Sequence, residues 1–253
     1  MPNDSATGNL APQRADLKIP RHLAVTMDGN GRWAKARGKA RTEGHRAGIG
    51  ALRKLVELSI SYGIDYLTVF SFSSENWTRP REEIDFIFGL MRRFIASDLE
   101  RLIANNVRIR VIGERSGLDR QILKLIDKAE ADTQANTGLT LLVAFNYGGK
   151  PELVQAVQKL AEQAASGELS PADIDESTIQ SALYAPDVPD PDLVLRTSGE
   201  HRFSNFLLWQ SAYSELVFID DYWPDFDEPA FVRVLEDFTR RERRFGAVEA
   251  RDL

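Results

Sequence analysis

Asp28 stands directly before a segment that is rich in positive charge and in glycine. From Arg32 to Arg46 the chain has six Lys and Arg residues, one His and a single acid, Glu43, although its net charge is -6. Arg offers a planar fork of N–H donors that suits phosphate oxygens, and glycine lets backbone N–H groups approach an anion closely. Asp28 would repel a phosphate, but Mg²⁺ is commonly held by one or two carboxylates together with substrate phosphates. The segment therefore predicts a diphosphate site with a divalent cation at Asp28.

Two other interpretations of this segment are weaker. Gly29, Gly31 and Ala34 match the G-x-G-x-x-G/A pattern of a dinucleotide site. That site needs an apolar helix next and an acidic residue at the end of the second strand, whereas here the next residues are basic and the second predicted strand ends only at Phe72. A solvated basic loop is the usual meaning of a charge run, but the glycines and the scarcity of acids argue against it.

A second basic cluster runs from Arg196 to Asn205, again after a predicted strand. It combines two arginines with hydroxyl side chains, a glycine and a histidine. Alone, it fits a surface turn with an Arg–Glu pair equally well. Because ligands of open α/β sheets bind beyond the carboxyl ends of the strands, the two clusters would meet at one edge. Together they predict two phosphate-bearing substrates, or one large one.

Short apolar runs alternate with helical patterns along the chain, which is typical of an open α/β sheet. The runs are nearly continuous, as expected for strands that are covered on both faces. The predicted strands are Leu23–Met27, Ile64–Phe72, Val107–Gly113, Leu139–Tyr147, Asp192–Thr197 and Glu215–Asp220. The predicted helices are Ile49–Tyr62, Glu82–Asn105, Leu118–Ala131, Glu152–Ala165 and Phe231–Arg244, and residues 167–192 are predicted to be a loose surface connection.

Composition and chain ends limit the class of protein. The chain has 253 residues, 43% of them hydrophobic, and no cysteine, which excludes disulfides and thiolate metal sites. An acidic net charge argues against a general nucleic-acid binder. The longest apolar run, Leu139–Phe145, is too short to span a bilayer, and the N-terminus lacks the pattern of a signal peptide. We therefore expect a cytoplasmic protein with one domain at 19–247, a disordered tail at 1–18 and a C-terminal tail at 248–253.

Several motifs occur together in a fixed order. They are HLAVTMDGNGRWAKARGKARTEGHRAG, FSFSSENWTRP, NTGLTLLVAFNYGG, DLVLRTSGEHRFSNFLLWQSAYSEL, WPDFD and RRERRFG, and they extend from about His22 to Gly246. This set closely resembles the cis-prenyltransferases, in particular the bacterial undecaprenyl diphosphate synthases. The resemblance implies a single domain with a six-stranded, mainly parallel sheet surrounded by helices, and a homodimer that contacts the inner face of the membrane transiently to release product. It also implies Mg²⁺-dependent, sequential condensation of isopentenyl diphosphate onto farnesyl diphosphate, which gives a long-chain polyprenyl diphosphate, the lipid carrier precursor for cell-wall synthesis.

The resemblance also implies residue roles. Asp28 resembles the aspartate that binds Mg²⁺, Glu215 resembles a second acidic metal contact from across the dimer, and Asn76 is a second catalytic candidate beside Asp28. The expected allylic diphosphate site consists of Gly29, Asn30, Gly31, Arg32, Trp33, Arg41 and His45. The expected isopentenyl diphosphate site consists of Ser73, Glu75, Arg79, Arg196, Arg202 and Ser204, with Arg244 and Gly246 reaching in from the partner. Phe72, Trp77, Glu200 and His201 are expected near the site, and Ile87, Met91, Leu139 and Val143 along a hydrocarbon tunnel whose floor is Leu139.

One position departs from the family pattern, because Ser198 stands where a second glycine is expected. Asp220, Asp221 and the nearby WPDFD have the wrong spacing for the D-D-x-x-D metal motif and predict a structural loop. Two hypotheses remain: an active cis-prenyltransferase, or a non-catalytic accessory subunit of the same fold. Accessory versions lack the leading aspartate and the basic cradle, both of which this chain has, so the sequence favours the enzyme.

Overall fold

The computed structural model describes residues 16–241, so the expected tail at 248–253, Arg244 and Gly246 lie outside the described residues. The other predicted tail, 1–18, extends too far. Leu17 and Ile19 pack against the core, and the Lys18 N–H donates to Thr239 Oγ1 at 2.9 Å. Residues 17 and 18 therefore belong to the folded domain, because Leu17 packs on the core and the Lys18 hydrogen bond ties the chain to its last helix.

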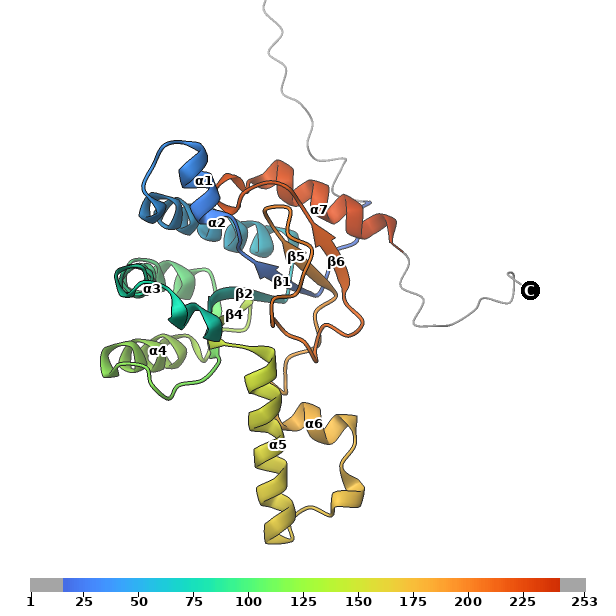
Figure 1. Cartoon of the computed structure of the whole chain (residues 1–253). Helices are drawn as coiled ribbons and strands as arrows, with labels where there is room; N and C mark the ends of the chain where they lie inside the picture. The colour runs from blue at the N-terminus through green and yellow to red at the C-terminus, as the bar shows by residue number, and fades with distance from the viewer. Residues whose placement is uncertain (1–15, 242–253) are drawn as a thin grey trace, which may run out of the picture.

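Six strands form one parallel sheet in the order β3-β4-β2-β1-β5-β6 (Figure 1). The strands are β1 His22–Thr26, β2 Tyr66–Ser73, β3 Arg108–Ile112, β4 Thr140–Tyr147, β5 Leu193–Arg196 and β6 Glu215–Phe218. All six predicted strands are present, and none of their ends differs from the predicted one by more than two residues. β1 lies between β2 and β5, so the three loops that follow these strands leave the sheet side by side.

Both faces of the sheet are buried, as the continuous apolar runs predicted. Leu23 and Val25 of β1 face a large core that α2, α3, α4 and α7 complete. Ala24, between them, faces a smaller core that includes Phe206 and Leu207. The helices are α1 Asn30–Ala36, α2 Arg41–Tyr62, α3 Arg81–Ala104, α4 Arg120–Thr133, α5 Gly149–Ser166, α6 Glu176–Ala182 and α7 Glu228–Arg240, and the shorter 3₁₀ turns include Ser74–Thr78, Pro171–Asp173 and Trp223–Asp225. α5 and α6 project from the sheet as an arm (Figure 1).

The basic segment after Asp28 is helical, which the sequence pattern did not predict. It forms α1 and the first two turns of α2, whose predicted start was Ile49. Small residues make the α1–α2 contact in place of large apolar ones. A Cβ added to Gly44 would lie 2.0 Å from the Asn30 carbonyl oxygen, and one added to Gly48 would lie 2.4 Å from Asn30 Oδ1. Contact of this kind leaves no large apolar residues in the sequence for a periodicity search to find.

Candidate active site

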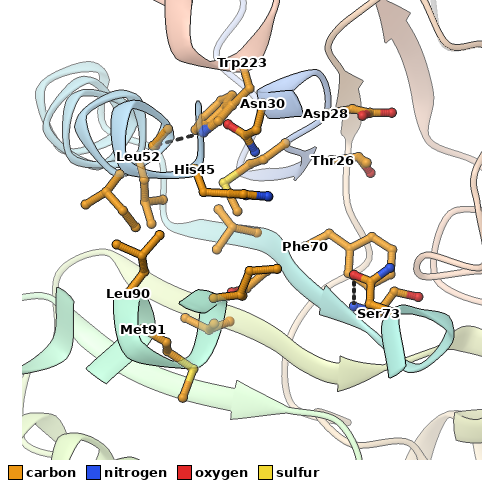
Figure 2. Close-up of a pocket in the computed structure, with 18 of the residues that line it drawn as sticks. Thr26, Asp28, Asn30, His45, Leu52, Phe70, Ser73, Leu90, Met91 and Trp223 are labelled. Carbon is orange, nitrogen blue, oxygen red and sulfur yellow. Dashed lines mark hydrogen bonds between the residues drawn. The ribbon is translucent and has the colours of Figure 1, made fainter. Parts of the chain in front are cut away.

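A cavity of about 720 Å³ opens at the carboxyl ends of β1, β2 and β5 and extends between the sheet and helices α2 and α3 (Figure 2). Its mouth is polar and its interior is apolar. The polar lining includes Asp28, Gly29, Asn30, Gly31, Arg41, His45, Ser73, Glu75, Asn76, Arg79, Arg196, Arg202, Ser204 and Asn205. The apolar lining includes Ile87, Leu90, Met91, Phe94, Ile95, Ile109, Val111, Ile126, Leu141 and Val143. The structure thus gathers most of the predicted site residues around one cavity.

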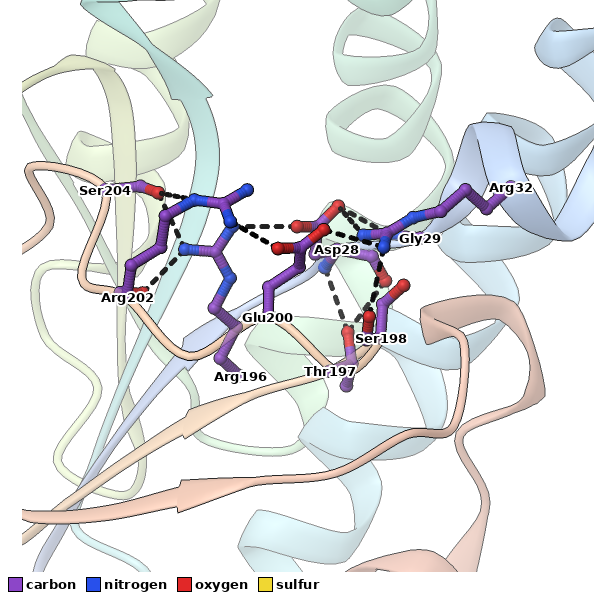
Figure 3. A network of polar contacts seen from close by, with 9 residues as sticks. All are labelled: Asp28, Gly29, Arg32, Arg196, Thr197, Ser198, Glu200, Arg202 and Ser204. Carbon is purple, nitrogen blue, oxygen red and sulfur yellow. Dashed lines mark hydrogen bonds and ion pairs between the residues drawn. The ribbon is translucent and has the colours of Figure 1, made fainter.

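Asp28 lies at the centre of the mouth, directly after β1 (Figure 3). Its Oδ2 accepts a hydrogen bond from Arg196 at 2.8 Å, and its Oδ1 accepts one from the Gly29 N–H at 2.6 Å and lies 3.3 Å from Arg32. Burial opposes ionisation, but the hydrogen bonds from Arg196 and Gly29 and the charges of Arg196 and Arg32 outweigh it. The pKa of Asp28 is therefore below its usual value. Asp28 is a carboxylate at neutral pH, the form that a metal ion requires.

Gly29 turns the chain from β1 into α1 in the left-handed region, with φ 100°. An added Cβ would lie 2.7 Å from Ser198 Oγ, so both the backbone conformation and the space require glycine. The turn brings Arg32 back over the β5 loop, which we define as residues 197–205. Arg32 donates to the Ser198 carbonyl at 3.1 Å and to Glu200 at 2.7 Å.

Arg196 joins the two predicted basic clusters into one site (Figure 3). Only 5% of the residue is exposed, and its guanidinium donates to Asp28, to the Arg202 carbonyl at 2.6 Å and to Ser204 Oγ at 2.7 Å. Arg202 also donates to Ser204 Oγ, at 3.2 Å, and forms an ion pair with Glu200. The expectation that the ends of β1 and β5 would meet at one edge is confirmed, because β1 and β5 are direct neighbours.

The β2 loop, which we define as residues 73–79, closes the mouth on the other side. The Asn76 side-chain oxygen accepts from the Ser73 N–H at 3.2 Å and so caps the turn. Glu75 accepts from the Ser73 hydroxyl, from Ser74 at 3.2 Å and from Asn205 Nδ2 at 2.6 Å. Burial opposes ionisation of Glu75, but these hydrogen bonds outweigh it and lower its pKa.

Glu83 gathers the remaining basic groups at the mouth. Its Oε1 accepts from Arg79 at 2.9 Å and lies 3.2 Å from Arg41 Nε and 3.5 Å from His45 Nε2. Burial lowers the pKa of His45, and Arg79 and Arg41 lower it further, against the opposing effect of Glu83. His45 is therefore neutral at pH 7 and contributes a ring nitrogen rather than a charge. It lines the cavity from α2 (Figure 2).

Sequence reasoning missed Glu83 and Asn205. Glu83 had one usable signal, its i,i+4 spacing from Arg79, which allows an ion pair once the first turn of α3 is known. Asn205 had none beyond membership of a long motif, because its contacts join segments that are far apart in the chain.

The cavity lining does not include Arg32, Trp33 or Leu139, which were expected in the diphosphate site or the tunnel. Arg32 lies beside the lining, 3.3 Å from Asp28. Trp33 donates its indole N–H to Asp225 at 2.6 Å and stacks under Arg37, whose guanidinium carbon is 4.6 Å from the ring centroid. Trp33 therefore packs on the outer face of α1, away from the cavity. Leu139 is buried just before β4, at the end of the sheet opposite the mouth. Leu141, Ile109 and Ile126 line the cavity instead.

The residues expected near the site support its loops. Phe72 and Trp77 pack edge to face at 5.4 Å and both contact Phe88, while the Trp77 indole donates to Asn146 Oδ1 at 2.7 Å. Glu200 holds Arg32 and Arg202, and His201 packs on Phe218 at 4.9 Å.

Glu215 lies opposite Leu193, at the amino end of the sheet, and pairs with Arg241 at 3.2 Å. Within one chain it is therefore remote from Asp28. Its expected role as a metal contact from across a dimer stays a prediction.

The donor set at Asp28 fits a cation that is completed by substrate. Residues 16–241 contain no group of three or more acidic, histidine or cysteine side chains placed to hold a metal ion. One ionised carboxylate beside several phosphate-binding groups is nevertheless the arrangement in which Mg²⁺ keeps waters and binds substrate phosphates. Asp28 is the residue that would hold it.

The parallel α/β sheet places a cationic mouth over an apolar cavity. Such a site is suited to bind molecules with a diphosphate head and a hydrocarbon tail. Comparison with known proteins agrees. Residues 26–246 match the family described as "Putative undecaprenyl diphosphate synthase". The chain belongs to this family, the cis-prenyltransferases, and is a prenyltransferase by descent.

The relatives are similar over nearly their whole length. Isoprenyl transferase 2 of Bradyrhizobium diazoefficiens is 55% identical over 99% of both chains. The farnesyl-diphosphate-specific ditrans,polycis-undecaprenyl-diphosphate synthase of Aliivibrio fischeri is 50% identical over 90% of this chain and 89% of its own. The crystal structure of lavandulyl diphosphate synthase from Lavandula x intermedia, in complex with dimethylallyl diphosphate, has a TM-score of 0.88 and 34% identity over 90% of this chain and 98% of its own. In the described part of the chain, no helix has the length and apolar character needed to cross a bilayer.

Proposed function

We propose that this protein condenses isopentenyl diphosphate repeatedly onto an allylic diphosphate, farnesyl diphosphate, to make a cis-polyprenyl diphosphate of undecaprenyl type. One observation carries the proposal: a mouth with guanidinium groups on both sides opens into an apolar cavity large enough for a hydrocarbon chain. The A. fischeri relative is named for this substrate and product.

The two sides of the mouth suit two diphosphates. Arg41 and His45 lie on the α2 side and would receive the allylic diphosphate, whose tail then enters the apolar interior. Arg79 of the β2 loop would contact isopentenyl diphosphate. Arg196 and Arg202, with the Ser204 hydroxyl, would hold isopentenyl diphosphate on the β5 side. Holding both heads rigidly supplies the proximity that a bimolecular condensation lacks in solution.

The demanding step is cleavage of the allylic C–O bond. Guanidinium and backbone N–H groups fixed around Asp28 stabilise the negative charge that builds on the leaving diphosphate. Mg²⁺, when held by Asp28 and phosphate oxygens, would add Lewis-acid stabilisation of the same charge. The C3–C4 double bond of isopentenyl diphosphate attacks the cation-like allylic carbon, and a proton leaves its C2. Asp28, Asn76 and the released diphosphate are the candidate acceptors of that proton.

We further propose that the protein works as a homodimer in the cytoplasm and touches the membrane only to release its lipid product. The projecting α5 supports a dimer, because Val154 and Val157 on it are 58% and 59% exposed. Apolar side chains this exposed on an arm are typical of an interface. A dimer would also give Glu215 a second site to reach.

The proposal is tested with purified protein, radiolabelled isopentenyl diphosphate, farnesyl diphosphate and Mg²⁺. Label should become extractable into butanol, and EDTA should abolish the extraction. Asp28→Asn should lower the rate by about 100-fold or more, because it removes the carboxylate that orients Arg196 and would hold the cation. Asp65→Asn, which alters an exposed pair with Arg21, should leave the rate unchanged.

Reverse-phase chromatography of the dephosphorylated product gives its chain length. Absence of extractable label under every condition would instead identify a non-catalytic accessory subunit.

A further inference from the structure

Asn205 connects three separate segments at the cavity mouth. Its backbone carbonyl accepts from the Gly149 N–H at 2.6 Å, and its side-chain oxygen accepts from the Lys150 N–H at 2.8 Å, so the β5 loop is fastened to the start of α5. Its side-chain nitrogen donates to Glu75 Oε1 at 2.6 Å, which fastens the same loop to the β2 loop. One side chain thus links the two loops that carry the groups facing isopentenyl diphosphate.

The position is selective for asparagine. The backbone is in the left-handed region, φ 65°, where asparagine is tolerated far better than most residues. The donor and the acceptor of the amide are both used, so neither orientation of the side chain is free. The junction is also tight, because a Cβ added to Gly148 would lie 2.7 Å from Asn205 Nδ2.

We propose that Asn205 is a positioning residue for isopentenyl diphosphate: it holds the β2 loop against the β5 loop so that Ser204 and Glu75 reach the substrate in register. Ser204 directly precedes Asn205 in the chain and accepts from both Arg196 and Arg202. A shift of Asn205 therefore moves the hydroxyl around which these two arginines are arranged. This inference rests on the proposed function for the identity of the substrate, but the link between the loops does not.

The polarity of the Asn205–Glu75 contact can be reversed. Asn205→Asp keeps the oxygen that accepts from Lys150 and tolerates the same backbone, but it places a carboxylate against Glu75. Glu75→Gln restores a donor on that side, because the Ser73 and Ser74 hydroxyls hold the other oxygen of residue 75 and orient its amide nitrogen toward residue 205. Each single variant is mismatched, and the double variant is matched.

Two measurements follow. The first is the Kd for isopentenyl diphosphate alone, which cannot react without an allylic partner. Asn205→Asp should raise it tenfold or more, since a charge-assisted hydrogen bond is replaced by repulsion, while the KM for farnesyl diphosphate stays within about twofold. The second is amide hydrogen exchange of residues 73–79 without ligand, which should accelerate in both single variants and return to the wild-type rate in the double variant.

Asn106→Asp is the matched control. Asn106 also has a left-handed backbone, φ 57°, and its side chain also accepts from a backbone N–H, that of Thr137, at the amino end of the sheet. It should leave the Kd and the exchange of the β2 loop unchanged. Thermal unfolding of each variant checks that it is folded, and Asn205→Gly, which suits the backbone but lacks the amide, replaces Asn205→Asp if that variant is not.

The inference is overturned if Asn205→Asp binds isopentenyl diphosphate within twofold of wild type. It is equally overturned if exchange of the β2 loop is unchanged in Asn205→Asp or is not restored in the double variant. Wild-type protein that fails to bind isopentenyl diphosphate would refute the proposed substrate, while the exchange data would still decide whether Asn205 holds the loops together.

Discussion

Arg196 illustrates how single residues prepare this site for anions. It is almost fully buried, and its two terminal nitrogens donate to one carboxylate, one carbonyl and one hydroxyl, while its buried Nε has no partner among the described residues. The three hydrogen bonds fix its charge in place. Glu200 and Glu83 hold the more exposed guanidinium groups in the same manner. Carboxylates thus orient the cations before any phosphate arrives, and such preorganisation is what makes charge stabilisation effective in catalysis.

Ser198 is under strain at the residue scale. Its φ is 80°, and its buried hydroxyl has no hydrogen-bond partner. A non-glycine residue in this region costs about 1–2 kcal/mol, which the greater freedom of glycine in the unfolded chain offsets in part. We expect Ser198→Gly to raise the free energy of unfolding by about 1 kcal/mol in urea titrations.

The control for this prediction is Ser116→Gly. Ser116 is exposed, lies in a turn and does not have a positive φ. It should lower stability by up to about 1 kcal/mol, because only the unfolded-state entropy changes. Destabilisation by Ser198→Gly would show that the buried hydroxyl contributes more than the strain costs.

At the scale of elements, the contact between α1 and α2 sets the position of the expected allylic diphosphate site, because these two helices carry most of its residues. α1 carries Arg32 and begins directly after Gly29, which follows Asp28, and it rests on α2 through Gly44 and Gly48. The backbones meet directly. No layer of flexible side chains separates the two helices, so a displacement of one helix must move the other.

Substitution of two glycines of the same helix tests this contact. Gly44→Ala places a methyl group 2.0 Å from the Asn30 carbonyl, so α1 must move. We expect a loss of about 2 kcal/mol in stability and a higher KM for the allylic substrate. Gly50→Ala, where a Cβ meets nothing within 4 Å, should stabilise the protein by about 0.5–1 kcal/mol. Equal effects of the two changes on stability and KM would refute the role of the contact.

At the scale of the whole molecule, buried histidines make stability depend on pH. His22 is the first residue of β1, where its Nδ1 contacts the Pro189 carbonyl at 2.6 Å and its Nε2 contacts Thr68 Oγ1 at 2.7 Å. Burial lowers the pKa of His22 to about 4, although the Pro189 carbonyl and Asp192 act in the opposite direction. His45 has a lowered pKa as well.

Because the folded-state pKa of His22 is below its unfolded value, the unfolded chain binds more protons as the pH falls from 6.5 to 4. Stability is therefore lost over this range, by about 3 kcal/mol for His22 at about 1.4 kcal/mol per pKa unit. His22→Gln should make the free energy of unfolding less steep with pH between 7 and 4, without abolishing the slope, since His45 remains. An unchanged slope would mean that His22 is not the group that titrates.

Sequence alone determined the features that are written in local composition. Six continuous apolar runs specified a parallel sheet buried on both faces, and the position of each basic cluster directly after a strand specified the edge at which a site would form. Asp28, Arg196, Arg202 and Ser204 could be selected for this reason, from their residue types and their places in the chain.

Only the tertiary structure decided what depends on contacts between distant segments. The α1–α2 junction is made by glycines, Trp33 faces outward toward Asp225, Leu139 stays outside the cavity, and Glu83 and Asn205 join loops that are remote in the chain. Periodicity reports which face of an element is apolar, but it carries no information on how closely two backbones approach or which distant polar groups meet. Those are properties of packing, because each depends on the positions of several elements at once.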